Sequence, residues 1–215
     1  MNEKAFVKNI VMAYQNARNT VSPNKKLLRG RSHTVSSVAE DLFAEYLVSS
    51  DSAISQIYID QAMSVAGSNK KFYPDIVVVK GNEIVLLIDL KMDLGYMRKD
   101  ILSTCKKHHD LSREIRGKEC KDIKTGDDKH TVTGLKFSKN IQYDIAVITS
   151  KNISKSAIDE QLHKLKEAKI STRVHILTTG IHPNEYGLKV QEILDNITIN
   201  ERSFKDIIET LSEKT

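Results

Sequence analysis

One segment, Ile76 to Ile88, is built almost entirely from β-branched and aliphatic residues around a single polar interruption. Ile-Val-Val-Val is followed by Lys-Gly-Asn-Glu and then by Ile-Val-Leu-Leu-Ile, which predicts a strand, a glycine-bearing turn and a second strand. Charged residues flank this segment on both sides: Tyr-Pro-Asp, ending at Asp75, precedes it, and Asp-Leu-Lys, from Asp89 to Lys91, follows it. The sequence therefore predicts a hairpin with two aspartates and a lysine at its open end.

The second strand of this hairpin shows why those charges need an explanation. Strict alternation divides it into two rows of side chains, Val85, Leu87, Asp89 and Lys91 on one face and Ile84, Leu86, Ile88 and Leu90 on the other. Both rows begin apolar, which is typical of a strand covered on both sides. A buried charge is costly unless it is paired or binds a metal.

Two interpretations fit these charges. Asp89 and Lys91 could form an ion pair at the end of the strand, with Asp75 as a turn residue after Pro74. Alternatively, the two aspartates could form a metal site. The combination of Pro-Asp and Asp-x-Lys on one hairpin, with an acidic amphipathic helix upstream, favours the metal site.

The register of the hairpin decides whether the two carboxylates can meet. A two-residue turn at Gly81-Asn82 would pair Asp75 with Ile88 and place the aspartates on opposite faces. A shared metal therefore requires an odd-length loop, for which we expect three residues including Gly81, or a bulge near Pro74 that restores the common face.

Composition limits the class of protein. With 215 residues and no linker rich in Pro, Gly or Ser, the chain is interpreted as one domain spanning residues 1–215. The 33 Lys and Arg residues exceed the 28 Asp and Glu residues by five, which favours a polyanionic partner. Only two cysteines are present, and no stretch approaches the roughly 18 apolar residues of a membrane helix. We expect a soluble cytoplasmic protein.

The remaining pattern alternates between helices and strands. Helices are expected over Met1–Asn19, from an N-cap at Thr34 or Ser36 to Ser50, from Leu94 to about Arg116, from Ser154 to Ala168, and around Leu188–Leu194 and Phe204–Leu211. Val38 is assigned to the apolar stripe of the second of these helices. Strands are expected at Ile57–Ile59, Tyr143–Thr149 and Arg173–Leu177, in addition to the hairpin. Lys118–Asn140 has no clear period and is expected to be a long loop, and the histidines, His108 and His109 among them, are expected at the surface. This order predicts an α/β fold with a mixed central sheet flanked by helices on both faces.

These residues resemble the PD-(D/E)xK nuclease superfamily, to which most type II restriction endonucleases belong. The resemblance covers a core of about residues 34–150, where Pro74-Asp75 and Asp89-Leu90-Lys91 match the two halves of the motif. It implies a restriction-endonuclease-like core in which Mg²⁺ is bound by Asp75, Asp89 and the backbone carbonyl of Leu90. The resemblance also implies that Lys91 orients or deprotonates the attacking water, and that Glu40, with Glu45 as the second candidate, completes the site.

The function implied by the resemblance is a Mg²⁺-dependent DNA endonuclease, with a type II restriction enzyme as the leading hypothesis and a homodimer as its usual assembly. Double-stranded DNA is the expected partner, and a basic loop with Lys25, Lys26, Arg29 and Arg31 is the candidate DNA contact. The segment from Lys118 to Lys139 is the second candidate. Two alternatives stay open: a structure-selective or repair nuclease of the same superfamily, and an inactive DNA-binding module.

Overall fold

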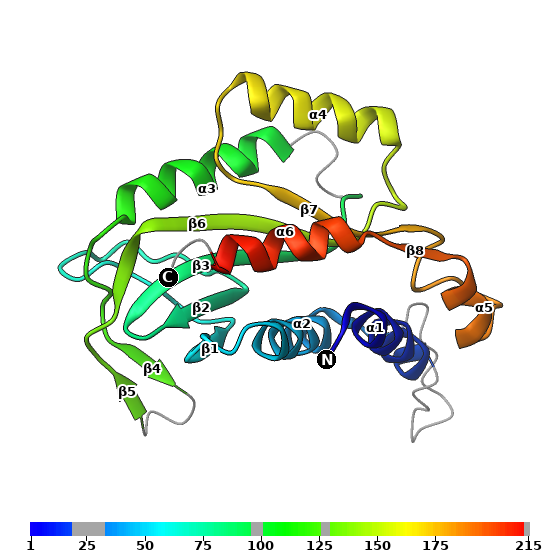
Figure 1. The fold of residues 1–215 in the computed structure, drawn as a ribbon, viewed down its shortest axis with the longest axis horizontal. Coiled ribbons are helices and arrows are strands. Elements are labelled where there is room, and N and C mark those ends of the chain that lie inside the picture. The colour runs from blue at the N-terminus through cyan, green and yellow to red at the C-terminus, as the bar shows by residue number, and fades with distance from the viewer. Residues whose placement is uncertain (19–32, 96–100, 126–129, 213–215) are drawn as a thin grey trace, which may run out of the picture.

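The computed structural model describes residues 1–18, 33–95, 101–125 and 130–212. Six strands form one mixed sheet in the order β1-β2-β3-β6-β7-β8, as Figure 1 shows. The strands are β1 (Gln56–Ile59), β2 (Ile76–Lys80), β3 (Glu83–Asp93), β6 (Lys136–Thr149), β7 (Val174–Gly180) and β8 (Ile197–Ile199). The first three strands pair antiparallel, β3, β6 and β7 are parallel, and β8 returns antiparallel to β7. A separate two-stranded ribbon is formed by β4 (Ile123–Thr125) and β5 (His130–Val132).

Helices cover both faces of this sheet, so the predicted mixed α/β architecture is confirmed (Figure 1). One layer contains α1 (Glu3–Arg18), α2 (Ser36–Ser50) and α6 (Glu201–Ser212), whose apolar side chains share a core with β2 and β3. The other layer contains α3 (Ile101–Ile115) and α4 (Lys155–Glu167), which pack with β6 and β7. The short α5 (Val190–Asp195) lies between β7 and β8 in the chain.

Four aromatic rings hold the first layer together. The ring of Phe6 on α1 lies 5.6 Å from that of Phe43 and 6.0 Å from that of Tyr46, both on α2. Phe204 on α6 closes the cluster, 5.8 Å from Phe6 and 5.1 Å from Tyr46. All four rings are almost fully buried. Such pairs add to the free energy of burial, so this cluster fixes α2, the helix that carries Glu40, against the sheet.

The hairpin has a different register from either of the two predicted. Its loop has two residues, Gly81 and Asn82, because Lys80 pairs with Glu83, so the prediction of a three-residue loop is wrong. A bulge does restore the common face, but it lies at Val85, opposite Val78 and Val79, and not near Pro74. A bulge leaves one residue unpaired and shifts the register by one. The aspartates therefore emerge on the same face.

The bulge also corrects the predicted rows of side chains. Val85 joins Leu86 in the core beneath α1 and α2, while Ile84 joins Leu87 in the core on the opposite face. Val85 and Ile84 therefore each lie on the face opposite to the one predicted. The residues from Leu86 onward alternate between the two faces as predicted. Strict alternation fails at this point because a bulge places two consecutive side chains on one face.

Four smaller predictions are also corrected. Helix α2 begins at Ser36 after Val35, and neither Thr34 nor Ser36 is its N-cap. Val38, assigned to the apolar stripe, is 44% exposed. The segment expected to be a long loop contains β4, β5 and the first residues of β6. His108 and His175 are buried and His109 is partly buried, and each has a hydrogen-bonding or ion-pairing partner that offsets the cost of removing its ring from water.

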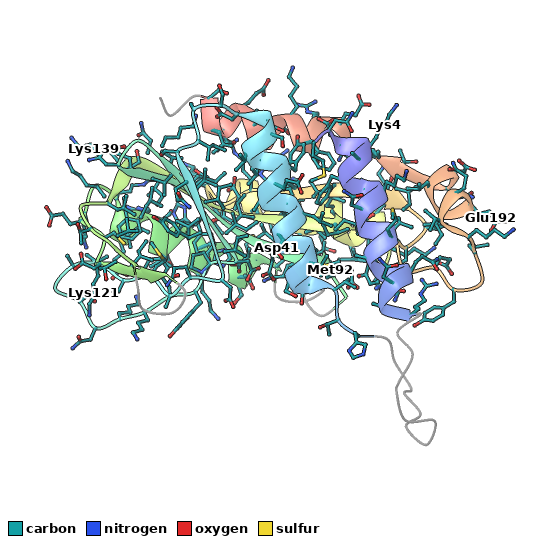
Figure 2. The ribbon with its side chains drawn as sticks, turned by 90° about the horizontal axis from the view of Figure 1, so that it is seen from below. Lys4, Asp41, Met92, Lys121, Lys139 and Glu192 are labelled. Carbon is teal, nitrogen blue, oxygen red and sulfur yellow. The ribbon has the colours of Figure 1, made fainter. Side chains whose placement is uncertain are left out.

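The topology brings several chain segments to one edge of the sheet. Parallel pairing places the carboxyl ends of β3, β6 and β7 together, and antiparallel pairing brings Asp75 and the end of β1 to the same edge. Helices α1 and α2 lie side by side across one face, and Figure 2 labels Asp41 on α2 and Met92 near the end of β3. In open α/β sheets, ligands bind outside the carboxyl ends of parallel strands.

Candidate active site

Asp75, Asp89 and Lys91 converge at this edge. Nζ of Lys91 lies 3.4 Å from Oδ2 of Asp75 and 3.5 Å from Oδ2 of Asp89. The backbone N–H of Leu90 donates a hydrogen bond of 2.7 Å to the same Asp75 oxygen. The side chains of Asp75 and Asp89 are 25% and 14% exposed, so the pair is sheltered yet reachable from solvent. The two strands of the hairpin thus deliver two carboxylates and one ammonium to a single point.

The two aspartates differ in their electrostatic surroundings. Burial raises the pKa of Asp75, and the charge of Asp89 raises it further, while Lys91 and the Leu90 N–H only partly compensate. Burial also raises the pKa of Asp89, but His108, Lys91 and Tyr143 together outweigh it and hold that pKa below its usual value. Asp89 is therefore a firmly ionised carboxylate, whereas Asp75 carries electrostatic strain that an additional cation would relieve.

His108 and Tyr143 hold both oxygens of Asp89. Nε2 of His108 lies 3.2 Å from Oδ2, and the hydroxyl of Tyr143 donates a hydrogen bond of 2.8 Å to Oδ1. The two rings are stacked, with centroids 3.9 Å apart and planes 2° from parallel. Burial and Asp89 raise the pKa of Tyr143, so its hydroxyl remains a donor. This stacked pair fixes the rotamer of the Asp89 carboxylate.

Neither His108 nor Tyr143 was predicted to lie at the site, although helical spacing in the sequence places His108 on a buried face. The buried positions of α3 are Ile101, Cys105, His108, Ser112 and Ile115, a spacing of four and three residues that defines one helical face. His108 therefore lies on the buried stripe of its helix. Tyr143 lies in the buried run of β6 that begins at Ile141, but nothing in the local sequence pairs it with an aspartate on β3.

Glu40 is the acidic residue of α2 whose pKa is changed by the charges of the site. Burial raises its pKa, followed by the charges of Asp75, Asp60 and Asp41, while Lys91 lowers it. Glu45, the second candidate, is exposed. Glu40 therefore lies in the electric field of Asp75 and Lys91, which favours it over Glu45. Asp60, at the end of β1, is a further nearby carboxylate that sequence reasoning did not identify; its φ of 49° marks a tight left-handed position.

The donor set suits a hard divalent cation. Mg²⁺ prefers carboxylate and carbonyl oxygens, and it is bound by one or two carboxylates with waters and substrate phosphate. Asp75 and Asp89 supply carboxylate oxygens, and a carboxylate has about four lone-pair positions, so the donors on Asp89 do not exhaust it. Among the described residues, no group of three or more His, Cys, Asp and Glu side chains is arranged to hold a metal ion. Binding by this set would therefore rely on water and substrate oxygens as well.

The basic loop carrying Lys25, Lys26, Arg29 and Arg31 lies outside the described residues. The residues that flank it are described, however: Arg18 is the last residue of α1, and His33 precedes the first residue of α2 by three positions. The second candidate DNA segment, Lys118 to Lys139, is described except for residues 126–129 and includes the β4-β5 ribbon.

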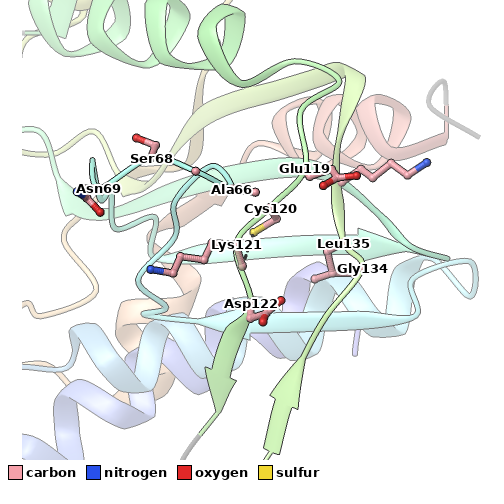
Figure 3. Close-up of a pocket in the computed structure, with 11 residues that line it drawn as sticks. Ala66, Ser68, Asn69, Glu119, Cys120, Lys121, Asp122, Gly134 and Leu135 are labelled. Carbon is pink, nitrogen blue, oxygen red and sulfur yellow. Dashed lines mark hydrogen bonds between the residues drawn. The ribbon is translucent and has the colours of Figure 1, made fainter.

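A cavity of about 470 Å³ lies at the opposite end of the sheet, near the first residue of β6 (Figure 3). Its wall includes Cys120, Lys121 and Asp122 on one side and the 66–69 turn on the other. Burial raises the pKa of the Cys120 thiol to about 11, so the thiol is neutral and a poor nucleophile. This cavity is separate from the aspartate pair.

Comparisons with protein-family models, curated proteins and solved structures found no match. In the described part of the chain, no helix has the length and apolar character needed to cross a membrane.

The opposite pKa shifts predict opposite effects on stability. Because the folded pKa of Asp75 is raised, folding becomes less favourable as pH rises from the ordinary aspartate value through that pKa. Asp75→Asn should therefore stabilise the metal-free protein at pH 7. The folded pKa of Asp89 is lowered, so its contribution is present at pH 7 and is lost as pH falls. Asp89→Asn should destabilise the protein.

Thermal unfolding at pH 7 and near pH 3 measures both effects. Each difference from the original protein should shrink at the lower pH, where protonation makes Asp75 neutral and weakens the ion pairs of Asp89. Equal destabilisation by the two substitutions at pH 7 would contradict the assignment of strain to Asp75.

Proposed function

We propose that this protein is a Mg²⁺-dependent DNA endonuclease of the PD-(D/E)xK superfamily, and specifically a type II restriction endonuclease with a restriction-endonuclease-like core. The observation that supports this best is the convergence of Asp75, Asp89 and Lys91 on one face at the open end of a hairpin. The order of helix, three-stranded meander, helix and parallel strand, followed by a further strand, is compatible with that core.

In this proposal, Asp75, Asp89 and the carbonyl of Leu90 would hold Mg²⁺, with Glu40 contributing directly or through water. When bound, Mg²⁺ supplies an activated water and stabilises charge on the phosphoryl oxygens. The firmly ionised Asp89 would be the principal anionic ligand, because its stacked neighbours keep it oriented and deprotonated. The strained Asp75 would gain most from a bound cation.

Lys91 would act on the attacking water and on the phosphate. Its ammonium already lies between the two carboxylates, so a small change of rotamer would carry Nζ from the carboxylate oxygens toward a substrate oxygen. There it would donate hydrogen bonds that orient the water and offset negative charge in the transition state.

Double-stranded DNA is the proposed substrate. The chain carries a formal net charge of +5, which favours a polyanion. The basic loop follows directly from the end of α1 and leads into α2, and both helices approach the edge that carries the aspartates. A homodimer, which would cut both strands, belongs to the same proposal.

The deciding experiment is incubation with long unmodified DNA, with and without Mg²⁺. Discrete bands that require Mg²⁺ are expected, and they would indicate a sequence-specific endonuclease. Mg²⁺-dependent cutting confined to junctions, nicks or ends would support a structure-selective nuclease instead. DNA binding without cleavage under all metal conditions would support an inactive binding module and overturn the proposal.

The basic loop is expected to carry part of the DNA affinity. Replacing Lys25, Lys26, Arg29 and Arg31 with alanine should flatten the plot of log affinity against log salt, because each neutralised phosphate contributes a slope of about −0.9. Binding titrations at several salt concentrations measure this. The matched control replaces Lys118, Lys121, Lys136 and Lys139, four cations of the second candidate segment. An unchanged slope in the loop variant and a flatter one in the control would move the DNA surface to that segment.

A further inference from the structure

A second cavity, of about 440 Å³, adjoins the candidate active site. It lies between the end of α1, the start of α2 and the segment after β7, and eight residues line it: Tyr14, His33, Thr34, Val35, Ser36, Met92, Asn184 and Tyr186. Met92 directly follows Lys91 in β3. Met92 packs against the core beneath α1 and α2, so the cavity lies on that face of the sheet, whereas the side chain of Lys91 alternates to the other face and only its backbone adjoins the cavity.

Arg18 organises one wall of this cavity. Its guanidinium carbon lies 4.3 Å from the centroid of the Tyr186 ring, and its Nε donates a hydrogen bond of 2.7 Å to Oδ1 of Asn184. The backbone N–H of Asn184 also donates to Nδ1 of His182, whose ring packs against Tyr14. A tyrosine and an asparagine are thus held in fixed orientations before any ligand arrives.

The groups on this wall, an aromatic ring and an amide, are the kinds of groups that bind a nucleobase. Tyr186 is 66% exposed although Arg18 covers part of its ring, so aromatic surface remains open for stacking. Since Arg18 fixes the carbonyl oxygen of Asn184, the amide NH₂ is left to donate to a ligand. Nη2 of Arg18 is buried behind this wall and has no hydrogen-bond partner among the described residues.

The opposite wall is suited to the sugar and phosphate. It includes the first residue of α2 and the hydroxyl-bearing Thr34 and Ser36. The N-cap Val35 has no side-chain acceptor for the first N–H groups of that helix. Free N–H groups at a helix start attract anions. The cavity therefore combines an aromatic platform, an amide donor and an anion-favouring end.

We propose that this cavity binds one nucleotide of the DNA substrate, with the base stacked on Tyr186 beside Asn184 and the phosphate directed toward the start of α2. The identification of the nucleotide as part of DNA rests on the proposed function. Stacking on tyrosine together with hydrogen bonds to a base edge is how proteins hold an unstacked base. The cavity would thereby anchor the strand close to Lys91.

The test is an NMR titration of Asp75→Ala protein, which should not cut DNA, with three probes in the absence of Mg²⁺. The probes are deoxyadenosine 5′-monophosphate, deoxyadenosine and inorganic phosphate. The monophosphate should bind more tightly than either part, and shifts should gather at Asn184, Tyr186 and Ser36. Adding Tyr186→Ala should weaken binding about tenfold, since base stacking contributes on the order of 1–3 kcal/mol. Adding Tyr186→Phe should preserve binding.

The matched control is Tyr73→Ala, since Tyr73 is a comparably exposed tyrosine, 61% accessible, beside Pro74. It should leave monophosphate binding unchanged. Nucleotide binding that is indifferent to Tyr186→Ala, or inorganic phosphate binding as tightly as the monophosphate, would overturn the proposal.

Cleavage assays separate this inference from the proposed function. In protein with Asp75 restored, Tyr186→Ala should lower kcat/KM on DNA without changing the salt slope, because stacking neutralises no phosphate. If that protein cuts DNA and Tyr186→Ala cuts equally well, the cavity proposal fails while the nuclease function stands. If nucleotide binding depends on Tyr186 but DNA is never cut, the nuclease proposal fails and the nucleotide site remains.

Discussion

Replacement of Asp75 or Asp89 by alanine is expected to abolish Mg²⁺-dependent cleavage while DNA binding survives. Each substitution removes a carboxylate from the proposed metal site, and metal binding contributes several kcal/mol of charge stabilisation in the transition state, equivalent to about 10³-fold in rate. Binding in the absence of metal should tighten slightly, because a negative charge near the phosphates is lost. Gel assays of cleavage and of binding, run on the same DNA, measure the two effects separately.

Three further variants control this result. Asp41→Asn changes an exposed carboxylate of α2 next to Glu40 and should leave cleavage nearly unchanged. Glu40→Gln should reduce cleavage, whereas Glu45→Gln, on the exposed side of the same helix, should not. Mg²⁺-dependent cutting by Asp75→Ala or Asp89→Ala would refute the assignment of the site.

Loss of His108 is expected to raise the Mg²⁺ concentration needed for half-maximal cleavage by about 10- to 100-fold, the usual effect of removing a residue that orients a metal ligand. His108 does not contact the substrate in this proposal. It holds Oδ2 of Asp89 while stacked on Tyr143, so its removal frees the carboxylate to rotate. Cleavage rates across a Mg²⁺ titration give the measurement, and saturating Mg²⁺ should restore much of the rate.

The neighbouring histidine provides the control. His109 lies on the same helix, but its Nδ1 contacts Ser171 and not the aspartates, so His109→Ala should leave the Mg²⁺ requirement unchanged. His108→Gln keeps a nitrogen donor and should recover part of the loss. Tyr143→Phe removes the hydroxyl contact to Oδ1 and should raise the requirement without removing the stack. A shift of equal size in His108→Ala and His109→Ala would indicate a general loss of helix α3 packing.

The local chemistry of the chain was enough to predict the elements that carry the site. β-Branched runs on both sides of Gly81 predict two strands, and helical spacing of apolar residues predicts the packed faces of α1 and α2. The charges at the end of such a buried hairpin identify Asp75, Asp89 and Lys91 as residues that need partners. These inferences succeed because backbone conformation and side-chain periodicity depend mainly on near neighbours.

The register of the hairpin depended on packing across the sheet. No residue near Val85 indicates a bulge in the sequence. With a two-residue loop and no bulge, the two aspartates would lie on opposite faces of the sheet. Burying both Val85 and Leu86 beneath α1 and α2, with Ile84 turned to the opposite core, places Asp75 and Asp89 on one face. A choice of this kind follows from how side chains fill space between layers, which a single segment does not encode.

The partners of Asp89 were likewise decided by the assembled fold. His108 lies on α3 and Tyr143 on β6, and they reach Asp89 only because β3 and β6 pair in parallel and α3 packs over them. Glu40 enters the same electric field from α2, on the other layer. The sequence alone identified the charged residues at the end of the hairpin. Contacts between distant segments determined which of them are buried, paired and held in place. Burial and the resulting pKa shifts depend on neighbours that only the folded chain brings together.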